Sequence, residues 1–287
     1  MIKYGGNYLI QWITKQFNFW IQNKQVPPCI LRSQIWLIPK GVFDGNIKNT
    51  RPINLIEILR KIFSLIFSQR IYSKISSNGI LKGTNYGFTP GYSTSDAIKL
   101  MQLIKDDAKD NGKIIIVAYL DVKKAYDSVH PNSIKCCLKK LKFDENYWHI
   151  MKNIFENRSM RVLTQAGVTN FFHPNTGLEQ GDRSSPILWN IFYEPLLNEL
   201  QNMNGYQICG ENISYLAYAD DLTLIASNDD DMEALLCKVN DYLKMHKMQL
   251  QPTKSIIYSN YIAKNFYIED SNLQIQISNI SSKQDLK

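Results

Sequence analysis

The sequence contains no apolar run long enough to cross a bilayer and no Cys-x-x-Cys pair. No run reaches the roughly 18 apolar residues that a membrane helix needs. The apolar N-terminus is broken by Gln, Lys and Asn, and no small-residue cleavage site follows it, which favours an amphipathic helix over a signal peptide. The five cysteines and four scattered histidines show no zinc-site or disulfide spacing. These absences predict an intracellular protein, in the cytoplasm or the nucleus, without membrane contact.

Internal repeats and low-complexity segments are also missing. The 287 residues are 44% hydrophobic and 21% charged, a composition that excludes a largely disordered chain and suits one or two globular domains. The 33 basic and 26 acidic residues leave a net charge of +7. This charge permits a polyanionic partner but does not require one.

The most informative stretch is Ser214 to Ala226, with the sequence SYLAYADDLTLIA. Apolar residues repeat at a period of two on both sides of Asp220 and Asp221, which predicts two strands joined by a tight hairpin with the acids at its tip. Two adjacent carboxylates repel each other unless a cation or a solvated turn relieves them. From this stretch alone, a plain hairpin turn and a cation site are both open.

A second acid follows an apolar run. Ile114 to Leu120 reads IIIVAYL, which is typical of a buried strand, and Asp121 comes directly after it. If this strand neighbours the hairpin in one sheet, three carboxylates meet at one edge. Such a set can hold the two divalent metals of in-line nucleotidyl transfer. The alternative for Asp121 is a carboxylate in an ordinary turn at the end of a strand.

The remaining pattern alternates helices with short strands. Lys40 and Arg51 flank a turn-rich loop from Gly41 to Asn49, at the ends of a possible β-hairpin. Further elements are expected as follows: a strand at 35–38, a helix at 55–75, a helix starting near Asp96 and capped by Ser95 or Thr94, helices at 134–141 and 147–158, a hairpin pairing 161–163 with 170–172, a helix at 186–200, a helix from 228 to about 246, and a strand at 255–258.

Six blocks of sequence, in order, resemble a known family. IPK…RPINLIEILRKIFSLIFSQRI, YGFTPGYSTSDAI, AYLDVKKAYDSV, GLEQGDRSSPILWNIFYEPLL, LAYADDLTLIA and LQPTKSIIYS are similar to the conserved blocks of reverse transcriptases. The likeness is to enzymes of non-LTR (LINE-like) retrotransposons and, more distantly, of group II introns and telomerase. It runs from about Ile35 to Tyr258. One YADD tetrapeptide is a weak signal, but six blocks at these spacings are a strong one.

This resemblance implies an α+β fold, with the fingers and palm of a right-hand polymerase and an antiparallel palm sheet backed by helices. We expect a helical extension at 1–34, fingers at 35–113, a palm at 114–262 that includes helices within 131–200, and a polar tail at 263–287. The chain ends about where a primer grip and thumb would begin, and endonuclease, RNase H and zinc-knuckle stretches are missing. We therefore expect a fragment of a longer element or a decayed copy.

The resemblance also implies roles for individual residues. Asp121, Asp220 and Asp221 would hold two Mg²⁺ ions, for which Mn²⁺ can substitute, with help from the backbone carbonyl of Val122. Lys254 would protonate or neutralise the leaving pyrophosphate. The residues expected at the incoming deoxynucleotide are Lys40 and Arg51 at the triphosphate, Tyr126 as the bulky side chain that rejects a 2′-hydroxyl, Gln180 beside the nucleotide, and Gly181 for close backbone approach. Tyr218 would support the hairpin near the primer end.

Two kinds of residue extend or depart from this pattern. Four cations are candidates for contacts with template or primer phosphates: Arg70, Lys123, Lys124 and Arg158. Asp182-Arg183-Ser184 stands where relatives more often carry Cys-Pro-Leu, and an acid at this position is expected to weaken or redirect nucleotide contacts. Tyr92 stands where an Arg is common.

The function expected from the resemblance is that of an RNA-directed DNA polymerase, a nucleotidyltransferase. Its partners would be an RNA template, a DNA or RNA primer and deoxynucleoside triphosphates; the sequence does not indicate an oligomeric state. Two alternatives stay open. One is a catalytically inactive, truncated nucleic-acid-binding remnant, and the other is template-independent terminal transfer.

Overall fold

A computed structural model describes residues 4–42, 45–77, 79, 84–89, 91–164, 166–261 and 266, and the backbone of 277–279. Most of the polar tail expected at 263–287 therefore lies outside the described residues. The chain forms two compact units. The first unit comprises residues 1–74 and 130–188, and the second comprises 75–129 and 189–287. Each unit is built from two separate stretches of chain. The fingers and palm boundaries drawn from the sequence stay a prediction.

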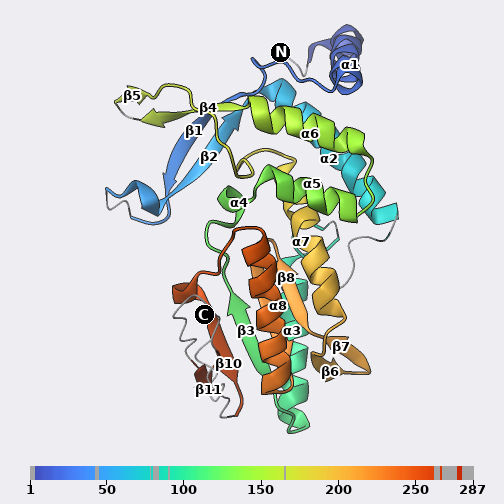
Figure 1. Ribbon diagram of the computed structural model, residues 1–287, viewed down its shortest axis with the longest axis vertical. Helices are drawn as coiled ribbons and strands as arrows, with labels where there is room; N and C mark the ends of the chain where they lie inside the picture. The colour runs from blue at the N-terminus through green and yellow to red at the C-terminus, as the bar shows by residue number, and fades with distance from the viewer. Residues whose placement is uncertain are drawn as a thin grey trace. The chain divides into compact units, whose positions relative to one another are not determined.

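The first unit contains a four-stranded sheet, in the order β2-β1-β4-β5 (Figure 1). Its strands are β1 (Arg32–Pro39), β2 (Thr50–Ile56), β4 (Ser159–Thr164) and β5 (Gly167–Val168). β1 and β2 form an antiparallel hairpin, which confirms the pairing expected around Lys40 and Arg51. β1 also pairs with β4 in parallel, with Gln34 opposite Arg161. This second pairing joins the two separate stretches of the unit.

Helices complete the first unit. They are α1 (Gly6–Asn23), α2 (Ile58–Ser77), α5 (Pro131–Lys140) and α6 (Glu145–Asn157), with the short 3₁₀ helix η2 (Ile47–Asn49) in the hairpin loop. The amphipathic N-terminal helix is confirmed: the rings of Phe17 and Trp20 are buried and lie 5.3 and 5.4 Å from the ring of Phe63 on α2. The unit boundaries fall within α2 and within α7 (Ser185–Gln201), so each of these helices contributes to both units.

A five-stranded sheet organises the second unit, in the order β11-β10-β3-β9-β8. Its strands are β3 (Ile116–Leu120), β8 (Tyr215–Tyr218), β9 (Asp221–Ala226), β10 (Ile256–Ser259) and β11 (Ile277–Asn279). β3 pairs antiparallel with β9 on one side and with β10 on the other (Figure 1). The expected neighbourhood of the Asp121 strand and the Asp-Asp hairpin is therefore confirmed.

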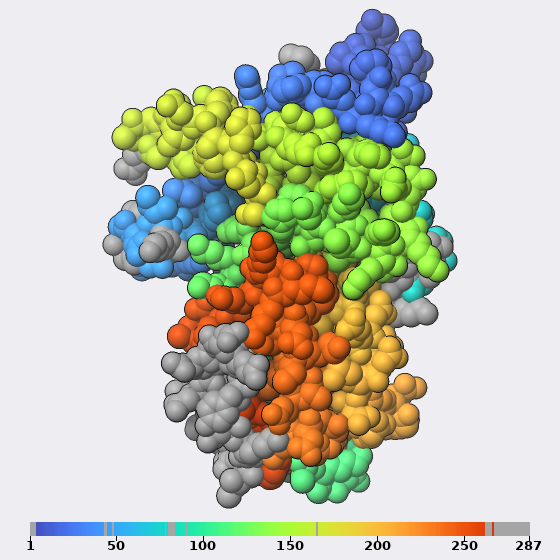
Figure 2. Space-filling model, in the orientation of Figure 1, coloured from blue at the N-terminus to red at the C-terminus, as the bar shows by residue number. Residues whose placement is uncertain are grey.

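Helices cover this sheet because its strands are apolar on both faces. α3 (Thr94–Asp110) packs Met101 and Ile104 against Val117 and Ile225. The opposite face is closed too, since Ala118 and Leu224 are fully buried and α8 (Asp229–Met245) contacts β9. α8 lies open on the face of the second unit drawn in Figure 2, and its exposed residues include Asp230, Glu233 and Asp241. The smaller elements of this unit are α4 (Ala125–Ser128), η3 (Pro252–Lys254) and the hairpin of β6 (Tyr206–Ile208) with β7 (Glu211–Ile213).

Several local predictions need correction. The sequence predicts that the helix of α2 starts at Leu55, but Leu55 and Ile56 belong to β2 and pair with Gln34 and Ser33. Strand pairing overrides helical spacing at these two residues. The cap of α3 is Ser93 rather than Ser95 or Thr94, and its backbone N–H donates to Oδ2 of Asp96 at 2.8 Å.

A further correction concerns the hairpin expected between 161–163 and 170–172. In the structure β4 pairs with β5, and Phe172 reaches back only through an isolated bridge with Met160. Gln165 lies outside the described residues. In the part of the chain that the structure describes, no helix is long and apolar enough to cross a membrane.

Candidate active site

The tight turn between β8 and β9 presents two carboxylates. Tyr218 pairs with Asp221, so Ala219 and Asp220 form a two-residue loop. The sequence places both acids at the tip, but only Asp220 lies there, and Asp221 is already the first residue of β9. Ala219 has φ +56°, which matches the positive φ that two-residue hairpins favour at their first central position. The turn therefore holds a non-glycine residue in a strained conformation, immediately before the acids.

The strand register brings Asp121 to the same edge of the sheet. Leu120 of β3 is opposite Leu222 of β9, so the next residues outward, Asp121 and Asp221, end their strands side by side. This is the juxtaposition that a shared carboxylate site requires. Asp121, Asp220 and Asp221 thus lie at one edge of the sheet of the second unit.

The electrostatics of this edge show that the three acids influence one another. Partial desolvation raises the pKa of Asp221, and the charges of Asp220 and then Asp121 raise it further. The positive charge of Lys254 lowers the pKa of Asp221, and its Nζ lies 3.4 Å from Oδ2 of Asp121. The lysine side chain is 64% exposed, so this ion pair is worth at most about 1 kcal/mol. One cation does not balance three carboxylates.

The segment that carries Lys254 is tied to the end of β3 by backbone hydrogen bonds. The N–H of Gln251 donates to the carbonyl of Asp121 at 2.7 Å, and the N–H of Lys123 donates to Gln249 at 2.9 Å. Val122 lies between these two bonds, in a bridge with Leu250. The bonds of this bridge fall on the residues flanking Val122, so the bridge does not use the Val122 carbonyl that the resemblance assigns to a metal.

The three carboxylates are the type of ligand that a hard divalent cation prefers. Carboxylate oxygens are what Mg²⁺ and Mn²⁺ prefer, and a cation would relieve the repulsion that raises the pKa of Asp221. Over the described ranges, no three Asp, Glu, His or Cys side chains are grouped closely enough to form a ready metal site. The chemistry of the donors therefore fits a metal, and the carboxylates would have to draw together around it.

Tyr126 lies in the same unit as the acids. Its ring stacks on Trp189, with ring centres 5.3 Å apart and planes 11° from parallel. Burial raises the pKa of Tyr126, and the charge of Asp220 raises it further. The hydroxyl is buried, and no hydrogen-bond partner for it occurs among the described residues. Tyr126, the side chain expected to reject a 2′-hydroxyl, is thus close enough to the turn for the charge of Asp220 to raise its pKa.

The other residues expected at the nucleotide lie in the first unit. Lys40 and Arg51 are exposed at the loop end of the β1–β2 hairpin, where the N–H of Lys40 donates to the carbonyl of Asn49 at 2.9 Å. Arg51 is opposite Ile38 in the β1–β2 register. The hairpin therefore presents two cations, as the sequence predicts. Their contact with a triphosphate stays a prediction.

The loop with Gln180 and Gly181 is fastened to the edge strand β2. The N–H of Asn54 donates to the carbonyl of Gln180 at 2.7 Å. Gly181 has φ +123°, and a Cβ at this position would lie 2.6 Å from the carbonyl oxygen of Asn54. Only glycine fits here without strain. The close approach expected of Gly181 is real, but in this structure the approaching group is the backbone of β2.

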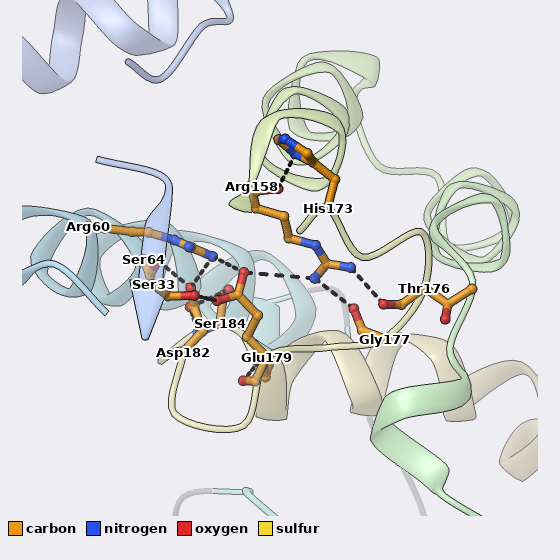
Figure 3. Close-up of polar contacts among 11 residues, drawn as sticks. Ser33, Arg60, Ser64, Arg158, His173, Thr176, Gly177, Glu179, Asp182 and Ser184 are labelled. Atoms are coloured by element: carbon orange, nitrogen blue, oxygen red, sulfur yellow. Dashed lines mark hydrogen bonds and ion pairs between the residues drawn. The ribbon is translucent and has the colours of Figure 1, made fainter. Parts of the chain in front are cut away.

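A buried ion network supports this loop (Figure 3). Nη2 of Arg60, on α2, lies 2.6 Å from Oε1 of Glu179 and 3.0 Å from Oδ2 of Asp182. The hydroxyls of Ser33 and Ser64 donate to the two acids, at 3.4 and 3.3 Å. Burial lowers the pKa of Arg60, but the two acids outweigh burial and leave it raised. The loop residues Gln180 and Gly181 are thus held between two fixed carboxylates.

Two expectations about charged residues are corrected by this network. The sequence predicts that Asp182 weakens or redirects nucleotide contacts. In the structure its side chain is 7% exposed, pairs with Arg60, and accepts hydrogen bonds from the N–H and hydroxyl of Ser184 at 2.8 and 2.7 Å. Arg158 is a candidate phosphate contact by sequence, but it is 2% exposed and donates to the carbonyls of Thr176 and Gly177, each at 2.8 Å. Neither side chain is available to a nucleic acid.

The first unit also contains a cationic groove that the sequence does not indicate. Arg32 and Arg161 lie over the ring of Phe171, at 5.5 and 5.1 Å from its centre. The ring is 42% exposed and borders an open groove of about 560 Å³ that also includes Leu55 and Glu57. Guanidinium groups stacked on an aromatic ring suit a ligand with negative charge and flat rings. The three residues come from different strands and loops, so sequence spacing gave no signal for them.

Comparison with known proteins agrees with this geometry. Residues 38–277 match the family model described as reverse transcriptase (RNA-dependent DNA polymerase). The chain is 27% identical over 248 residues to the retrovirus-related Pol polyprotein from the type-1 retrotransposable element R2 of Nasonia vitripennis, a match that covers 86% of this chain and 24% of that protein. It is also 27% identical to the corresponding type-2 element R2DM polyprotein of Drosophila melanogaster, over 80% of this chain and 21% of that protein.

Solved structures share the fold. The apo telomerase of Candida tropicalis, truncated from its C-terminal domain, superposes with a TM-score of 0.59 at 17% identity, over 88% of this chain and 56% of that one. A telomerase of the same organism in complex with a fragment of telomeric RNA gives the same TM-score over 94% of this chain and 48% of that one. The expected α+β fold is confirmed. The chain spans about a quarter of the length of the R2 polyproteins and about half of the telomerases.

Proposed function

The chain belongs to the reverse transcriptase (RNA-dependent DNA polymerase) family, with a domain of the non-LTR retrotransposon type, and we propose that it copies RNA into DNA. In this proposal it transfers nucleotides from deoxynucleoside triphosphates to the 3′-hydroxyl of a DNA or RNA primer. The observation that carries the proposal is the strand register at one edge of the second sheet. Asp121 and Asp221 end neighbouring strands there, and Asp220 occupies the adjoining turn.

Divalent cations are general cofactors of this family, and two Mg²⁺ ions, when bound, would activate the primer hydroxyl and neutralise the triphosphate. Asp121, Asp220 and Asp221 would hold them, with the carbonyl of Val122. Lys254, beside Asp121, would hold a proton or positive charge near the leaving pyrophosphate. Tyr126 would exclude a ribose 2′-hydroxyl by its bulk, stacked on Trp189.

The first unit would supply the nucleotide and template contacts. Lys40 and Arg51 would neutralise the triphosphate, as cations do in phosphoryl transfer. Gln180 and Gly181 would pass beside the nucleotide on a loop that Arg60, Glu179 and Asp182 keep in one conformation. Template RNA would contact the groove at Phe171, where a base can stack while Arg32 and Arg161 meet phosphates.

Primer extension tests the catalytic proposal. The wild-type chain is supplied with an RNA template, a labelled DNA primer, deoxynucleotides and Mg²⁺, beside the variant Asp220→Asn. Asp241→Asn on α8 is the matched control, because it makes the same chemical change at an exposed carboxylate of the same unit. We expect extension by wild type and Asp241→Asn and none by Asp220→Asn. Extension by a folded Asp220→Asn variant would remove the mechanism.

RNA binding tests the groove separately. Changing Arg32 and Arg161 to Gln should weaken binding of single-stranded RNA and reduce the slope of its salt dependence by up to about one for each phosphate that no longer meets a cation. An unchanged slope would exclude the groove as a phosphate contact. The alternative of a catalytically inactive nucleic-acid-binding remnant predicts RNA binding without extension by the wild type. The unusual acid at position 182 speaks for that alternative, but Asp182 is paired with Arg60.

A further inference from the structure

Trp189 touches the catalytic turn directly. Its side chain is fully buried, and its indole Nε1–H donates to the carbonyl of Ala219 at 2.7 Å. Ala219 is the strained turn residue that precedes Asp220. A hydrogen bond at this carbonyl restrains the peptide plane that links Ala219 to Asp220. It therefore fixes the backbone position from which the Asp220 side chain projects.

The ring of the same tryptophan supports Tyr126. The two rings are stacked 5.3 Å apart and 11° from parallel, and Tyr126 makes no hydrogen bond within the described chain that would hold its hydroxyl. Stacking on Trp189 therefore restrains the position of the phenol ring. One side chain thus contacts both the metal-holding turn and the expected sugar-selecting residue, through different atoms.

The next residue along the helix secures the other side of the turn. Asn190 Nδ2 donates to the carbonyl of Gly87 at 3.0 Å. Gly87 packs against the turn so closely that a Cβ would lie 2.0 Å from the backbone nitrogen of Ala219. Tyr86 adds a backbone hydrogen bond to Ala217 at 2.9 Å. The turn is held between Trp189 on its carbonyl side and Gly87 on its amide side, and both supports depend on the start of the same helix segment.

We infer that Trp189 is a positioning residue with two separable functions. Its indole N–H fixes the Asp220–Asp221 turn, and its ring fixes Tyr126 for discrimination between deoxyribose and ribose. This inference rests on the proposed function. A phenylalanine at 189 keeps a ring for Tyr126 to stack on but loses the N–H. A leucine loses both.

The two variants therefore separate the functions in single-nucleotide extension, with dATP or ATP offered opposite uridine. For Trp189→Phe we expect kcat for dATP to fall about tenfold, with its KM and the dATP/ATP preference nearly unchanged. For Trp189→Leu we expect the same loss of kcat and, in addition, a fall of about tenfold in the dATP/ATP preference. Trp148→Phe, the same change at a buried residue of the first unit, is the matched control and should alter neither.

Hydrogen exchange provides a measurement that does not need activity. A peptide covering 215–226 reports the opening of the turn, whether or not the chain polymerises. We expect about tenfold faster exchange at this peptide in Trp189→Phe and Trp189→Leu, and no change in Trp148→Phe. Faster exchange without extension by the wild type would leave the positioning role standing and refute the proposed function. Unchanged exchange in Trp189→Phe, or equal loss of sugar preference in both Trp189 variants, would overturn the inference.

Discussion

Replacing Arg60 with Met should destabilise the first unit more than any exposed substitution on the same helix. Arg60 and Arg158 carry two positive charges into a buried cluster, and Glu179 and Asp182 carry two negative ones, all at most 7% exposed. Methionine fills a similar volume but leaves the cluster with an unpaired negative charge. Breaking a buried ion pair by removing one partner costs about 3–5 kcal/mol. We expect a loss of this size in the free energy of unfolding.

A double-mutant cycle tests the charge argument itself. Asp182→Asn alone leaves one excess positive charge, whereas Arg60→Met combined with Asp182→Asn leaves Arg158 and Glu179 balanced, 3.8 Å apart. The double variant should therefore lose less stability than the sum of the two single variants, by about 1–3 kcal/mol. Arg70→Met makes the same change at an exposed position of α2 and should cost less than about 1 kcal/mol.

Urea unfolding is monitored by hydrogen exchange of peptides that cover residues 54 and 179–185. This readout measures the differences in free energy of unfolding in the first unit alone. Strict additivity of the two changes would refute the view that the cluster is stabilised by compensation of its charges. A loss below about 1 kcal/mol for Arg60→Met would show that water or neighbouring groups satisfy the unpaired carboxylates.

Three further predictions concern single residues. Gly181→Ala forces a Cβ to within 2.6 Å of the Asn54 carbonyl at φ +123°, so urea unfolding should show a loss of about 1–3 kcal/mol and extension assays a raised KM for deoxynucleotides. The hydrogen bond from Tyr206 is the main cause that holds the pKa of Asp107 below its ordinary 3.8. The ionised Asp107 therefore stabilises the fold above that pH, and this stabilisation is lost as the pH falls through the pKa of the folded state. Thermal unfolding of Asp107→Asn should accordingly depend less on pH than that of the wild type between about 5 and 3. Tyr126→Ala should raise ATP incorporation relative to dATP by at least about tenfold in single-nucleotide extension, and an unchanged ratio would contradict its role at the sugar.

The sequence was sufficient for the features that depend on local periodicity. The apolar runs around Asp220 and before Asp121 are strongly patterned, and antiparallel neighbours end at a common edge, so the meeting of these acids followed once the strands were paired. The N-cap of α8 at Asn228 and the cations of the β1–β2 hairpin are likewise local signals.

Features built from distant residues were not predictable in the same way. Arg60 and Glu179 are 119 positions apart, and nothing in the spacing of either indicates a partner. From the sequence alone, Asp182 was therefore interpreted as an acid that disturbs nucleotide contacts. In the structure it forms a buried ion pair with Arg60. The parallel contact of β1 with β4 was missed because its two strands lie far apart in the sequence. The β6–β7 hairpin was missed because short strands carry little periodic signal. Leu55 was misassigned because backbone pairing across a sheet outweighs helical spacing.

The buried cluster also has a consequence for synthesis on the ribosome. Arg60 leaves the exit tunnel well before Glu179, and at about 5–20 residues per second the 119 intervening positions take roughly 6–24 s to translate. For most of that delay β1 lacks its parallel partner β4, and throughout it α2 holds a cation without its carboxylates. The first unit can complete its buried cluster only after Asp182 has been made. Its nascent form therefore exposes a strand edge, the kind of surface that chaperones protect.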